Sequence, residues 1–459
     1  MTRFIKGVKI LKKRTKRQQA IIKRRIFLGI SAAVLIVALV GVSVLISAVI
    51  KAVKSDNEFE ISSDIVSTVD NSSKDDESKK TVTATVINTG DIILHDRIFK
   101  DAQLSDGTFD FSDFFKVADK RFMSADYAVA NLEVTLGGTE AGAYSGFPAF
   151  NSPDSLLDPI KAAGFDLLLT ANNHSYDTRL AGLKRTVAKV KEYGFDFIGT
   201  KETESDPTYI VKDINGIKIG ITCFTYETKS AADGRKTLNG NVLATEAQNL
   251  INSFDYDEIN VFYSSAESVI KNMQKDGADA IVFYIHWGEE YQRTPNTWQK
   301  SIAQKLCNMG VDVIVGGHPH VLQPVSLLHA EGSSKTTVCA YSLGNAISNQ
   351  RRELLSTLCP TGHSEDGAIL TYTFTKTPDG VTSLTSVDLV PTWLDKYKVN
   401  GKYRYTMYPL DNENSAGSYG LDNATVSKMK ESYERSKAIV GNGLTECQKA
   451  LGCEIRFKE

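Results

Sequence analysis

The side chains of this 459-residue chain that are best suited to chemistry are carboxylates, amides and imidazoles, and they recur in short motifs. In the strongest motif, His318 and His320 lie two residues apart in a turn restricted by Gly317 and Pro319, so both imidazoles cannot easily be core residues. The motifs with potential metal ligands are Gly90-Asp91 with His95, Asn131-Leu132-Glu133, Asn172-Asn173-His174, His286-Trp287-Gly288 and Gly317-His318-Pro319-His320. Such oxygen and imidazole donors suit divalent zinc, manganese or iron, whereas calcium and magnesium sites are nearly all oxygen.

Two metal ions held by this set of ligands would support hydrolytic chemistry. Glu133, if it lies centrally, could bridge two ions. Two ions about 3.5 to 4 Å apart can clamp an oxyanion and generate a hydroxide nucleophile near neutral pH. The sequence therefore indicates a centre for two divalent ions, with manganese, zinc or iron as the candidates.

Each motif taken alone also has a structural interpretation. A single histidine at the end of a strand, such as His286, is more often hydrogen-bonded than metal-bound, and Gly90-Asp91 can be only a turn. The metal interpretation depends on convergence, because the ligand-bearing motifs each follow a predicted strand. His329 and His363 have no such neighbours and are interpreted as surface or structural residues, with His363 the nearer of the two to the mouth of a site.

The elements that must position these motifs begin at about residue 81, where short β-branched runs alternate with helix-period stretches in a pattern typical of a layered α/β fold. Strands are predicted at 82–88, 127–131, 166–170, 195–199, 217–224, 280–285, 311–315 and 337–341, and helices at 111–124, 155–163, 179–193, 264–276 and 297–309. Antiparallel strands are predicted at 368–375 and 384–390, followed by a peripheral tail, 393–459, with one helix at about 423–439. In open α/β sheets, side chains from distant positions converge at the carboxyl ends of the strands.

The net charge of −2 averages two unlike parts of the chain. Residues 1–25 hold eleven Lys or Arg and no Asp or Glu, which leaves 42 basic against 55 acidic residues beyond them. Residues 26–50 are uncharged and apolar, and as a helix they would reach roughly 37 Å, enough to span the ~30 Å hydrocarbon core of a bilayer with some tilt. Residues 51–80 are mostly polar and predict a flexible linker.

We expect the apolar run to be an uncleaved signal anchor. It is longer than the apolar region of about 7 to 15 residues in a cleaved signal peptide, although Ser47-Ala48-Val49 could mimic a cleavage site. The basic head should stay in the cytoplasm and place the C-terminal domain outside the cell. Membrane topology or anionic lipid explains this charge better than nucleic acid does, because the head adjoins a membrane span.

Composition excludes several classes of protein. With 42% apolar and 24% charged residues, the chain is neither wholly disordered nor a many-spanning membrane protein. The six Cys residues show no CxxC motif and no regular spacing, so the sequence predicts neither a zinc ribbon nor a disulfide framework.

The ordered series of motifs resembles that of the CapA family of capsule or poly-γ-glutamate biosynthesis proteins, which includes the PgsA type. The resemblance is carried by Gly90-Asp91-Ile92-Ile93-Leu94-His95, Asn131-Leu132-Glu133, Ala171-Asn172-Asn173-His174 with Asp177, His286-Trp287-Gly288, Gly317-His318-Pro319-His320 and Ser342-Leu343-Gly344-Asn345. Each piece alone is weak, but the full series is specific. It covers about residues 81–392, which we take as the predicted domain.

This family is related to the calcineurin-like metallophosphatases, so the resemblance implies a four-layer α/β/β/α sandwich with a dinuclear site at the strand ends. It also implies one ion held by Asp91, His95, Glu133 and His320 and a second held by Glu133, Asn173, His286 and His318. By the same resemblance, His174 would act beside a bound oxyanion as a general acid or transition-state donor, with Asp177 as its orienting partner.

Three positions depart from the metallophosphatase pattern. His95 lies four residues after Asp91, where a metallophosphatase usually has Asp-x-His, and Glu133 stands where a bridging Asp is usual. Ser175 follows His174, where phosphatases commonly have an acid. These departures agree with the CapA pattern.

Three hypotheses for function follow. The first is a membrane-anchored, outward-facing, metal-dependent hydrolase that acts in making, exporting or releasing an anionic capsule polymer such as poly-γ-glutamate. The second is a non-catalytic scaffold or polymer-binding subunit of a membrane synthase, and the third is a tethered metallophosphoesterase. The expected partners are the membrane, an anionic polymer or phosphoester substrate and synthase subunits, but not nucleic acid.

Overall fold

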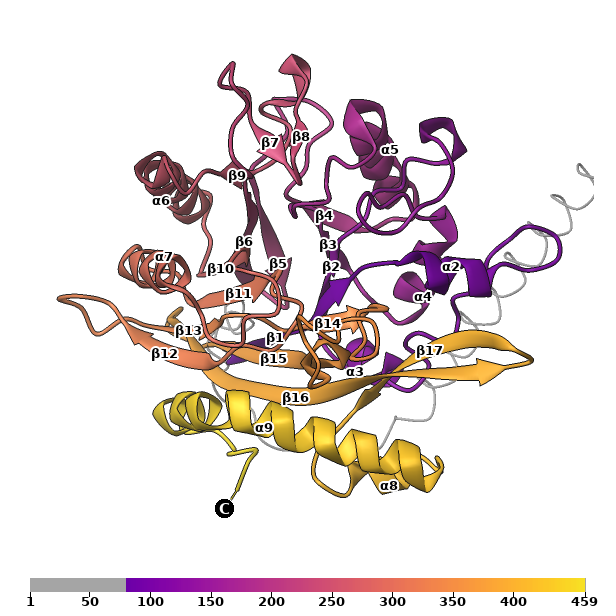
Figure 1. Cartoon of the computed structure of the whole chain (residues 1–459). Coiled ribbons are helices and arrows are strands. Elements are labelled where there is room, and N and C mark those ends of the chain that lie inside the picture. Colours follow the sequence, from indigo (N-terminus) through magenta and orange to yellow (C-terminus); the bar gives the residue numbers. More distant parts are fainter. Residues whose placement is uncertain (1–79, 459) are drawn as a thin grey trace, which may run out of the picture. The chain divides into compact units, whose positions relative to one another are not determined.

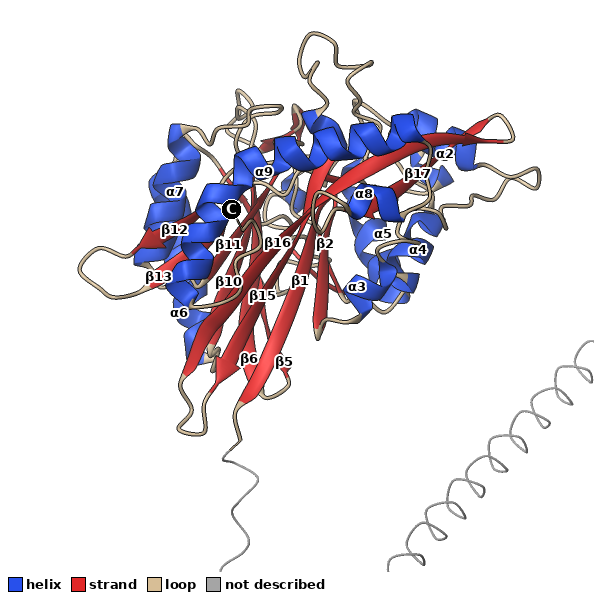
Figure 2. Cartoon of the chain, turned by 90° about the horizontal axis from the view of Figure 1, so that it is seen from below, coloured by secondary structure: helices blue, strands red, loops and turns tan. Residues whose placement is uncertain are grey.

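The computed structural model describes residues 80–458 of the chain. The predicted basic head, 1–25, the predicted signal anchor, 26–50, and all but the last residue of the predicted linker, 51–80, lie outside these described residues. Between residues 80 and 458, no helix is both long and apolar enough to cross a membrane. The described residues form a mixed α/β fold built on two large sheets (Figures 1 and 2).

The first sheet consists of β1 (Val82–Ile92), β2 (Tyr127–Leu132), β3 (Leu167–Leu169), β4 (Asp196–Ile198), β14 (Asn345–Ile347), β15 (Asp366–Lys376), β16 (Thr382–Val399) and β17 (Lys402–Pro409). Its order is β17-β16-β15-β1-β2-β3-β4, and β14 pairs with β1. The strands from β1 to β4 are parallel, whereas β15, β16 and β17 extend the sheet antiparallel. The parallel half therefore ends its strands at one edge, where three of the motifs lie.

The second sheet consists of β5 (Tyr209–Ile214), β6 (Ile217–Tyr226), β9 (Ser253–Phe254), β10 (Ala280–His286), β11 (Val313–Gly317), β12 (Val325–His329) and β13 (Thr336–Ala340). Its order is β12-β13-β11-β10-β6-β5, with β9 paired to β6. The central strands β6, β10, β11 and β13 are parallel, and β5 and β12 are antiparallel. A separate hairpin is formed by β7 (Thr237–Leu238) and β8 (Asn241–Val242).

The helices are α2 (Asp96–Ala102), α3 (Asp119–Met123), α4 (Leu157–Ala162), α5 (Arg179–Glu192), α6 (Ile259–Lys275), α7 (Thr297–Asn308), α8 (Ser415–Ser418) and α9 (Asn423–Leu451). Short 3-10 helices cover Thr139–Ala141, Asp154–Leu156, Thr245–Ala247 and His363–Glu365. Figure 1 shows α6 and α7 on the outer side of the second sheet and α4 and α5 beyond the first. The outer faces of both sheets are therefore covered by helices.

Alternating side chains of the central strands explain this layering. Val86 of β1 and Val282 of β10 lie in one core that both sheets share. Their neighbours Ile87 and Phe283 lie in separate cores with residues of the outer helices. Because successive side chains of a strand point to opposite faces, each sheet buries one apolar layer against the other sheet and one against helices.

The C-terminal helix α9 closes the shared core along one side, where it contacts both β16 and β12. Met429, Val440 and Leu444 of this helix belong to the core between the sheets, and Figure 2 shows α9 crossing the strands. The predicted tail, 393–459, is therefore not peripheral. The folded domain continues past the predicted boundary at residue 392, because β16 and β17 complete the sheet and α9 covers its open side.

Most predicted strands match observed ones, but the helix predicted at 111–124 is wrong over most of its length, since only α3 is helical there. The carbonyls of Asp113 and Phe114 accept hydrogen bonds from the hydroxyl of Thr406 and the backbone N–H of Met407 in β17. Carbonyls bonded to another strand in this way do not form the hydrogen bonds of a continuous helix. Phe111 and Phe115 still bury their rings, which produced the helix-like apolar spacing.

Candidate metal centre

The predicted ligands lie at the carboxyl ends of neighbouring parallel strands. On the first sheet, Asp91 is in register with Asn131 of β2, and on the second sheet His286 is in register with Gly317 of β11. The sheets approach closely at this edge, because a Cβ atom on Gly317 would lie 2.8 Å from Oδ1 of Asp91. Glycine at position 317 therefore leaves the space that the Asp91 carboxylate occupies.

Glu133 lies in the middle of the site and is fully buried. Its Oε1 is 3.2 Å from Nε2 of His286 and 3.7 Å from Nε2 of His320. Among the described residues, the same oxygen has no hydrogen-bond partner. This oxygen therefore lies between the two imidazoles that the resemblance assigns to different ions.

His318 and His320 form a turn with an unusual backbone. Both residues are buried and have positive φ angles, 96° for His318 and 55° for His320. Side chains other than glycine adopt such angles at a cost of about 1–3 kcal/mol, and they persist where surrounding contacts hold them, often at functional sites. The backbone N–H of His318 donates to Oδ2 of Asp91 at 3.2 Å, which ties the turn to the first sheet.

Burial and charge act differently on these two histidines. Burial, with the neighbouring imidazoles of His286 and His320, lowers the pKa of His318 well below its usual value. Burial also lowers the pKa of His320, but the carboxylates of Glu133 and Asp91 outweigh it and raise that pKa to about 9. The buried carboxylates thus favour positive charge at this position, as a cation site requires.

Potential ligand atoms cluster within 4.8 Å of one another in three groups, which are Glu133-His286-His318, Asp91-Glu133-His320 and Glu290-His318-His320. The first two groups share Glu133 and correspond to the two predicted ion sites. Oε1 of Glu133 and Nδ1 of His318 are buried and have no hydrogen-bond partner within residues 80–458. Because unpaired buried polar atoms are costly, these atoms and the mixture of oxygen and imidazole donors fit divalent ions.

The two other predicted ligands differ in position. Oδ1 of Asn173 lies 2.8 Å from Nε2 of His286, so Asn173 adjoins the first group. His95, just before α2, lines the same cavity as His320 but is in none of the three groups formed by the described residues. Its Nδ1 accepts the backbone N–H of Asn349 at 3.3 Å. Burial, followed by the charge of His320, lowers the pKa of His95 to about 3.

His174 and Asp177 form a buried pair beside the ligands, with Nδ1 of His174 2.7 Å from Oδ2 of Asp177. Asp177 Oδ2 also accepts the backbone N–H of Phe150 at 2.7 Å. Nδ2 of Asn239 donates to Oδ1 of Asp177 at 3.1 Å and to the carbonyl of Pro148 at 2.8 Å. The turn between β7 and β8 therefore positions the pair, a contact that sequence reasoning missed.

A cavity of about 290 Å³ opens beside the centre. Its lining combines His95, His174, His320, Glu290, Tyr291, Asn349 and Gln350 with Ile93, Phe147, Phe150, Leu354, Leu355 and Leu358. Three of its apolar side chains are strongly exposed, at 73% for Phe147, 58% for Leu354 and 67% for Leu358. No Lys or Arg lines this cavity within the part of the chain that the structure describes.

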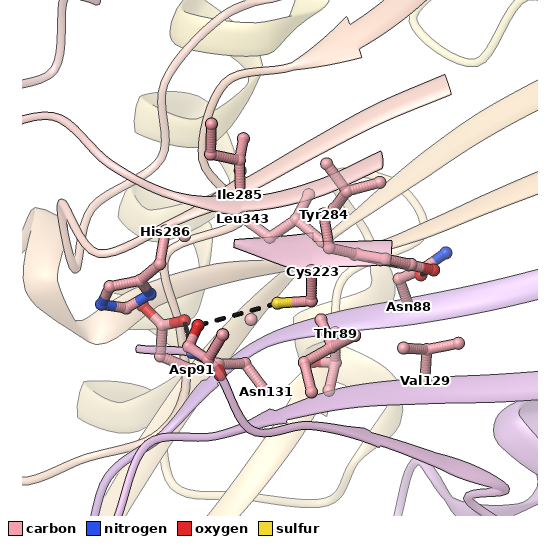
Figure 3. A pocket seen from close by; sticks show the side chains of 16 residues that line it. Asn88, Thr89, Asp91, Val129, Asn131, Cys223, Tyr284, Ile285, His286 and Leu343 are labelled. Carbon is pink, nitrogen blue, oxygen red and sulfur yellow. Dashed lines mark hydrogen bonds between the residues drawn. The ribbon is translucent and has the colours of Figure 1, made fainter. Parts of the chain in front are cut away.

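A smaller pocket of about 20 Å³, enough for one water molecule, lies behind the ligands (Figure 3). Figure 3 shows Asp91 and His286 at one end and Asn88 at the other. The thiol of Cys223 lies between them and donates to the carbonyl of Ala171 at 3.6 Å. Burial raises the pKa of Cys223 to about 12, and Cys223 is in none of the ligand groups formed by the described residues.

Several functional candidates had no assigned role in the sequence analysis. Nδ2 of Asn131 donates to Asp91 at 2.8 Å, and Oδ1 of Asn345 lies 3.0 Å from Nδ1 of His320. Both residues belong to motifs quoted above. Their position at or after the end of a predicted strand is the sequence feature that could have identified them as functional residues. Glu290 lies four residues after the end of β10, and the Asn239-Gly240 pair is a hairpin signal, but neither shows which site it reaches.

Comparisons with known proteins agree with these motifs. The family model described as "Bacterial capsule synthesis protein PGA_cap" matches residues 85–350. "Capsule biosynthesis protein CapA" of Bacillus anthracis is 32% identical over 201 residues, which is 44% of this chain and 44% of that protein. "PGA biosynthesis protein CapA" of Bacillus subtilis (strain 168) is 27% identical over 279 residues, 60% of this chain and 64% of that protein.

The matched region covers less than two thirds of the length of either relative. The family model, however, covers more than half of this chain and spans each of the ligand-bearing motifs. The resemblance to the CapA type is thereby confirmed. The chain belongs to the family of bacterial capsule synthesis proteins described as PGA_cap.

Proposed function

We propose that this chain takes part in the biosynthesis, export or release of an anionic capsule polymer, with poly-γ-glutamate as the first candidate. The family and the names of the two relatives support this role. The observation that carries a chemical role is Oε1 of Glu133, which is buried between His286 and His320 and has no hydrogen-bond partner in the part of the chain that the structure describes. A purely structural core would gain nothing from an unpaired carboxylate oxygen at this place.

The proposed fold is a four-layer α/β/β/α sandwich of the calcineurin-like metallophosphatase type with a dinuclear centre. One ion would be held by Asp91, His95, Glu133 and His320, and the other by Glu133, Asn173, His286 and His318. Two divalent ions would polarise an oxyanion and supply a hydroxide near neutral pH. His174, oriented by Asp177, would donate a hydrogen bond or a proton to the substrate oxygen.

The charge of the chain bears on how an anionic substrate would be held. Beyond residue 25 the chain has 42 basic and 55 acidic residues. The cavity beside the centre has no Lys or Arg in its lining among the residues that the structure describes. An anionic group of the substrate would therefore depend on the charge of the metal ions, with hydrogen bonds from residues such as His174 and Asn349.

We also propose that residues 26–50 anchor the protein in the cell membrane, with the N-terminus in the cytoplasm and the folded domain outside the cell. The eleven basic residues before the apolar run and the absence of charge within it support this orientation. A synthase in the same membrane would be within reach of an anchored domain, and subunits of such a synthase are the proposed partners.

Metal analysis of the purified full-length protein tests the proposal. We expect two manganese, zinc or iron ions per chain, and less than one in the double variant His318→Ala/His320→Ala. His329→Ala is the matched control, because His329 is exposed at the end of β12 and lies in none of the ligand groups. The proposal is contradicted if the wild-type protein binds no divalent ion, or if the double variant retains both.

The shape of the cavity favours a second candidate function, hydrolysis of a small phosphoester. A cavity of about 290 Å³ with Phe150 and Leu355 in its wall fits an aryl or alkyl group attached to a phosphate on the metal ions. Turnover of a generic aryl phosphate with added Mn²⁺ would support this function. Its absence with manganese, zinc and iron alike would count against it.

Capsule production separates an enzymatic role from a scaffold role. Glu133→Gln and His174→Ala remove the proposed bridge and the proposed donor while leaving the chain otherwise intact. If the protein acts chemically, cells that carry either variant should lose the capsule at unchanged protein level. Normal capsule in both strains would instead indicate a non-catalytic, polymer-binding or assembly role.

A further inference from the structure

Glu290 is a carboxylate at the metal centre to which neither the motifs nor the family comparison assigns a role. Its ligand oxygen lies with nitrogens of His318 and His320 in a group whose atoms are all within 4.8 Å of one another. The two histidines are buried and Glu290 is exposed. One imidazole of each proposed ion site is therefore shared by two carboxylates, Glu133 from the buried interior and Glu290 from the exposed side.

The backbone holds Glu290 in this place. Gly288 has a φ of 88° and Tyr291 a φ of 62°, so the chain turns sharply on both sides of the glutamate pair. The backbone N–H of Tyr291 donates to the carbonyl of Pro319 at 2.8 Å, which ties this turn to the residue between the two histidines. The positive φ of Tyr291 is strained, and strained residues persist where the surroundings fix them, often at functional sites.

The neighbouring Glu289 serves a different purpose. Its Oε1 accepts a hydrogen bond from Nδ2 of Asn296 at 3.3 Å, at the start of α7. Glu290 belongs to one of the ligand groups and lines the cavity beside the centre. Within the described residues, Glu289 is in no ligand group and does not line that cavity. Two adjacent glutamates thus have the same charge and size, but only one of them reaches the centre.

Charge balance gives Glu290 a reason to bind. The ligands proposed above include two carboxylates, Asp91 and Glu133, and their other members are neutral imidazoles or an amide. Two divalent ions would therefore carry a net charge of about +2 in largely buried surroundings, where uncompensated charge is expensive. A third carboxylate reduces this excess, and one that enters from the solvent side can leave again when an anionic substrate group arrives.

We propose that Glu290 is an additional metal ligand of the substrate-free centre, bound on its solvent side and displaced by the anionic group of the substrate. This inference rests on the dinuclear centre of the proposed function. The substrate would then reach the metal ions from the side of Glu290, because an exchangeable ligand must occupy the position that the substrate takes.

Metal titration of the purified full-length protein tests the inference without any need for an activity. Wild type, Glu290→Gln and the matched control Glu289→Gln are titrated with Mn²⁺ against a competing chelator, and stoichiometry and affinity are compared. We expect Glu290→Gln to bind at least one ion about 10-fold to 100-fold more weakly, the range typical for loss of a supporting ligand interaction. Glu289→Gln should match the wild type.

Inorganic phosphate provides a second readout. If phosphate takes the place of Glu290, it should bind the manganese-loaded Glu290→Gln protein at least as tightly as the loaded wild type, because no carboxylate has to be displaced. Equal manganese affinity and stoichiometry in wild type and Glu290→Gln would overturn the inference and leave the proposed function intact. A wild-type protein that binds no ion would overturn both.

Discussion

At the scale of single residues, Asp177 holds the imidazole of His174 in place. Its Oδ2 lies 2.7 Å from Nδ1 of His174, while Asn239 and the backbone of Phe150 also donate to this carboxylate. Asp177 therefore fixes the imidazole by charge as well as by position. Oriented imidazoles of this kind contribute roughly 10²- to 10⁴-fold to proton-transfer steps.

We predict that Asp177→Asn lowers the turnover number for an aryl phosphate by roughly 10- to 100-fold, because the amide keeps the shape of the side chain but removes the carboxylate that orients Nδ1 of His174. The measurement is steady-state kinetics with saturating Mn²⁺. Metal content should stay at the wild-type value, since Asp177 belongs to none of the ligand groups. A fall in turnover that merely follows a loss of metal would contradict this assignment.

His363 permits a prediction about pH and stability. Burial, followed by the charges of nearby arginines that include Arg293, lowers the pKa of His363 to about 4. In the unfolded chain the imidazole titrates near 6.5, so between about pH 6.5 and pH 4 the unfolded state binds a proton that the folded state does not. The contribution of His363 to folding stability is therefore fully present above about pH 6.5 and is lost as the pH falls towards about 4.

The free energy of unfolding in urea, measured at pH 7.5 and pH 5, checks this sign. From the higher to the lower pH, the free energy of unfolding of the wild-type protein should fall by roughly 1 kcal/mol more than that of His363→Gln, whose side chain cannot titrate. Other groups titrate in both proteins, so only the difference between the two pH effects is informative. An identical pH dependence would show that His363 does not contribute.

The residues that the sequence identified share one physical property. His286 is the last residue of a strand, and Glu133 and His318 each come directly after one, so the ends of the parallel strands bring them together whatever the loops do. Glu290 and Asn239 lie in loops, and their approach to the centre depends on turns such as the positive φ of Tyr291. Sequence patterns do not encode where a loop returns, and these two residues were therefore not predicted.

At the scale of elements, α9 depends on a close approach to β12. A Cβ atom on Gly443 would lie 1.7 Å from the carbonyl oxygen of Val325, whereas one on Gly441, half a turn away, would meet side-chain atoms at no less than 3.5 Å. The two glycines belong to the same helix but face different surroundings. Gly443 permits contact between the backbones of α9 and β12, whereas Gly441 only weakens the helix.

We predict that Gly443→Ala destabilises the protein by about 2–3 kcal/mol, because the backbone of β12 or the helix must move. Gly441→Ala is the matched control and should be neutral or stabilise by up to about 1 kcal/mol, since alanine favours helix. Urea unfolding measures both changes. Equal effects of the two substitutions would mean that α9 does not pack on β12 as described.

The start of α9 was predictable from the sequence, but its full length and its burial were not. Its start near residue 423 was predicted from the sequence, and α9 begins at Asn423. Its length and burial were not, because Met429 and Leu444 lie in the core between two sheets, where α9 contacts β12 of one sheet and β16 of the other. The central parallel strands were predicted by their own apolar runs, whereas β17 and the burial of α9 are recognised only once the sheets beside them are known.

At the scale of the whole molecule, the net charge of −2 conceals a head with eleven positive charges followed by a remainder of 42 basic and 55 acidic residues. These two parts are separated by 25 uncharged, apolar residues, 26–50. Basic residues beside a span are retained in the cytoplasm, and acidic residues contribute little to orientation. The distribution of charge therefore supports the proposed placement of the folded domain outside the cell.

We predict that the full-length protein fractionates with membranes and that protease added to intact spheroplasts digests its C-terminal domain. Replacing the eleven basic residues of the head with Gln should shift a large fraction of the chains to a protected state, because the charge that holds the head inside is gone. Exchanging each Lys for Arg and each Arg for Lys is the matched control and should leave orientation unchanged. Protection of the wild-type domain would place the centre in the cytoplasm, where a polymer outside the cell could not be its substrate.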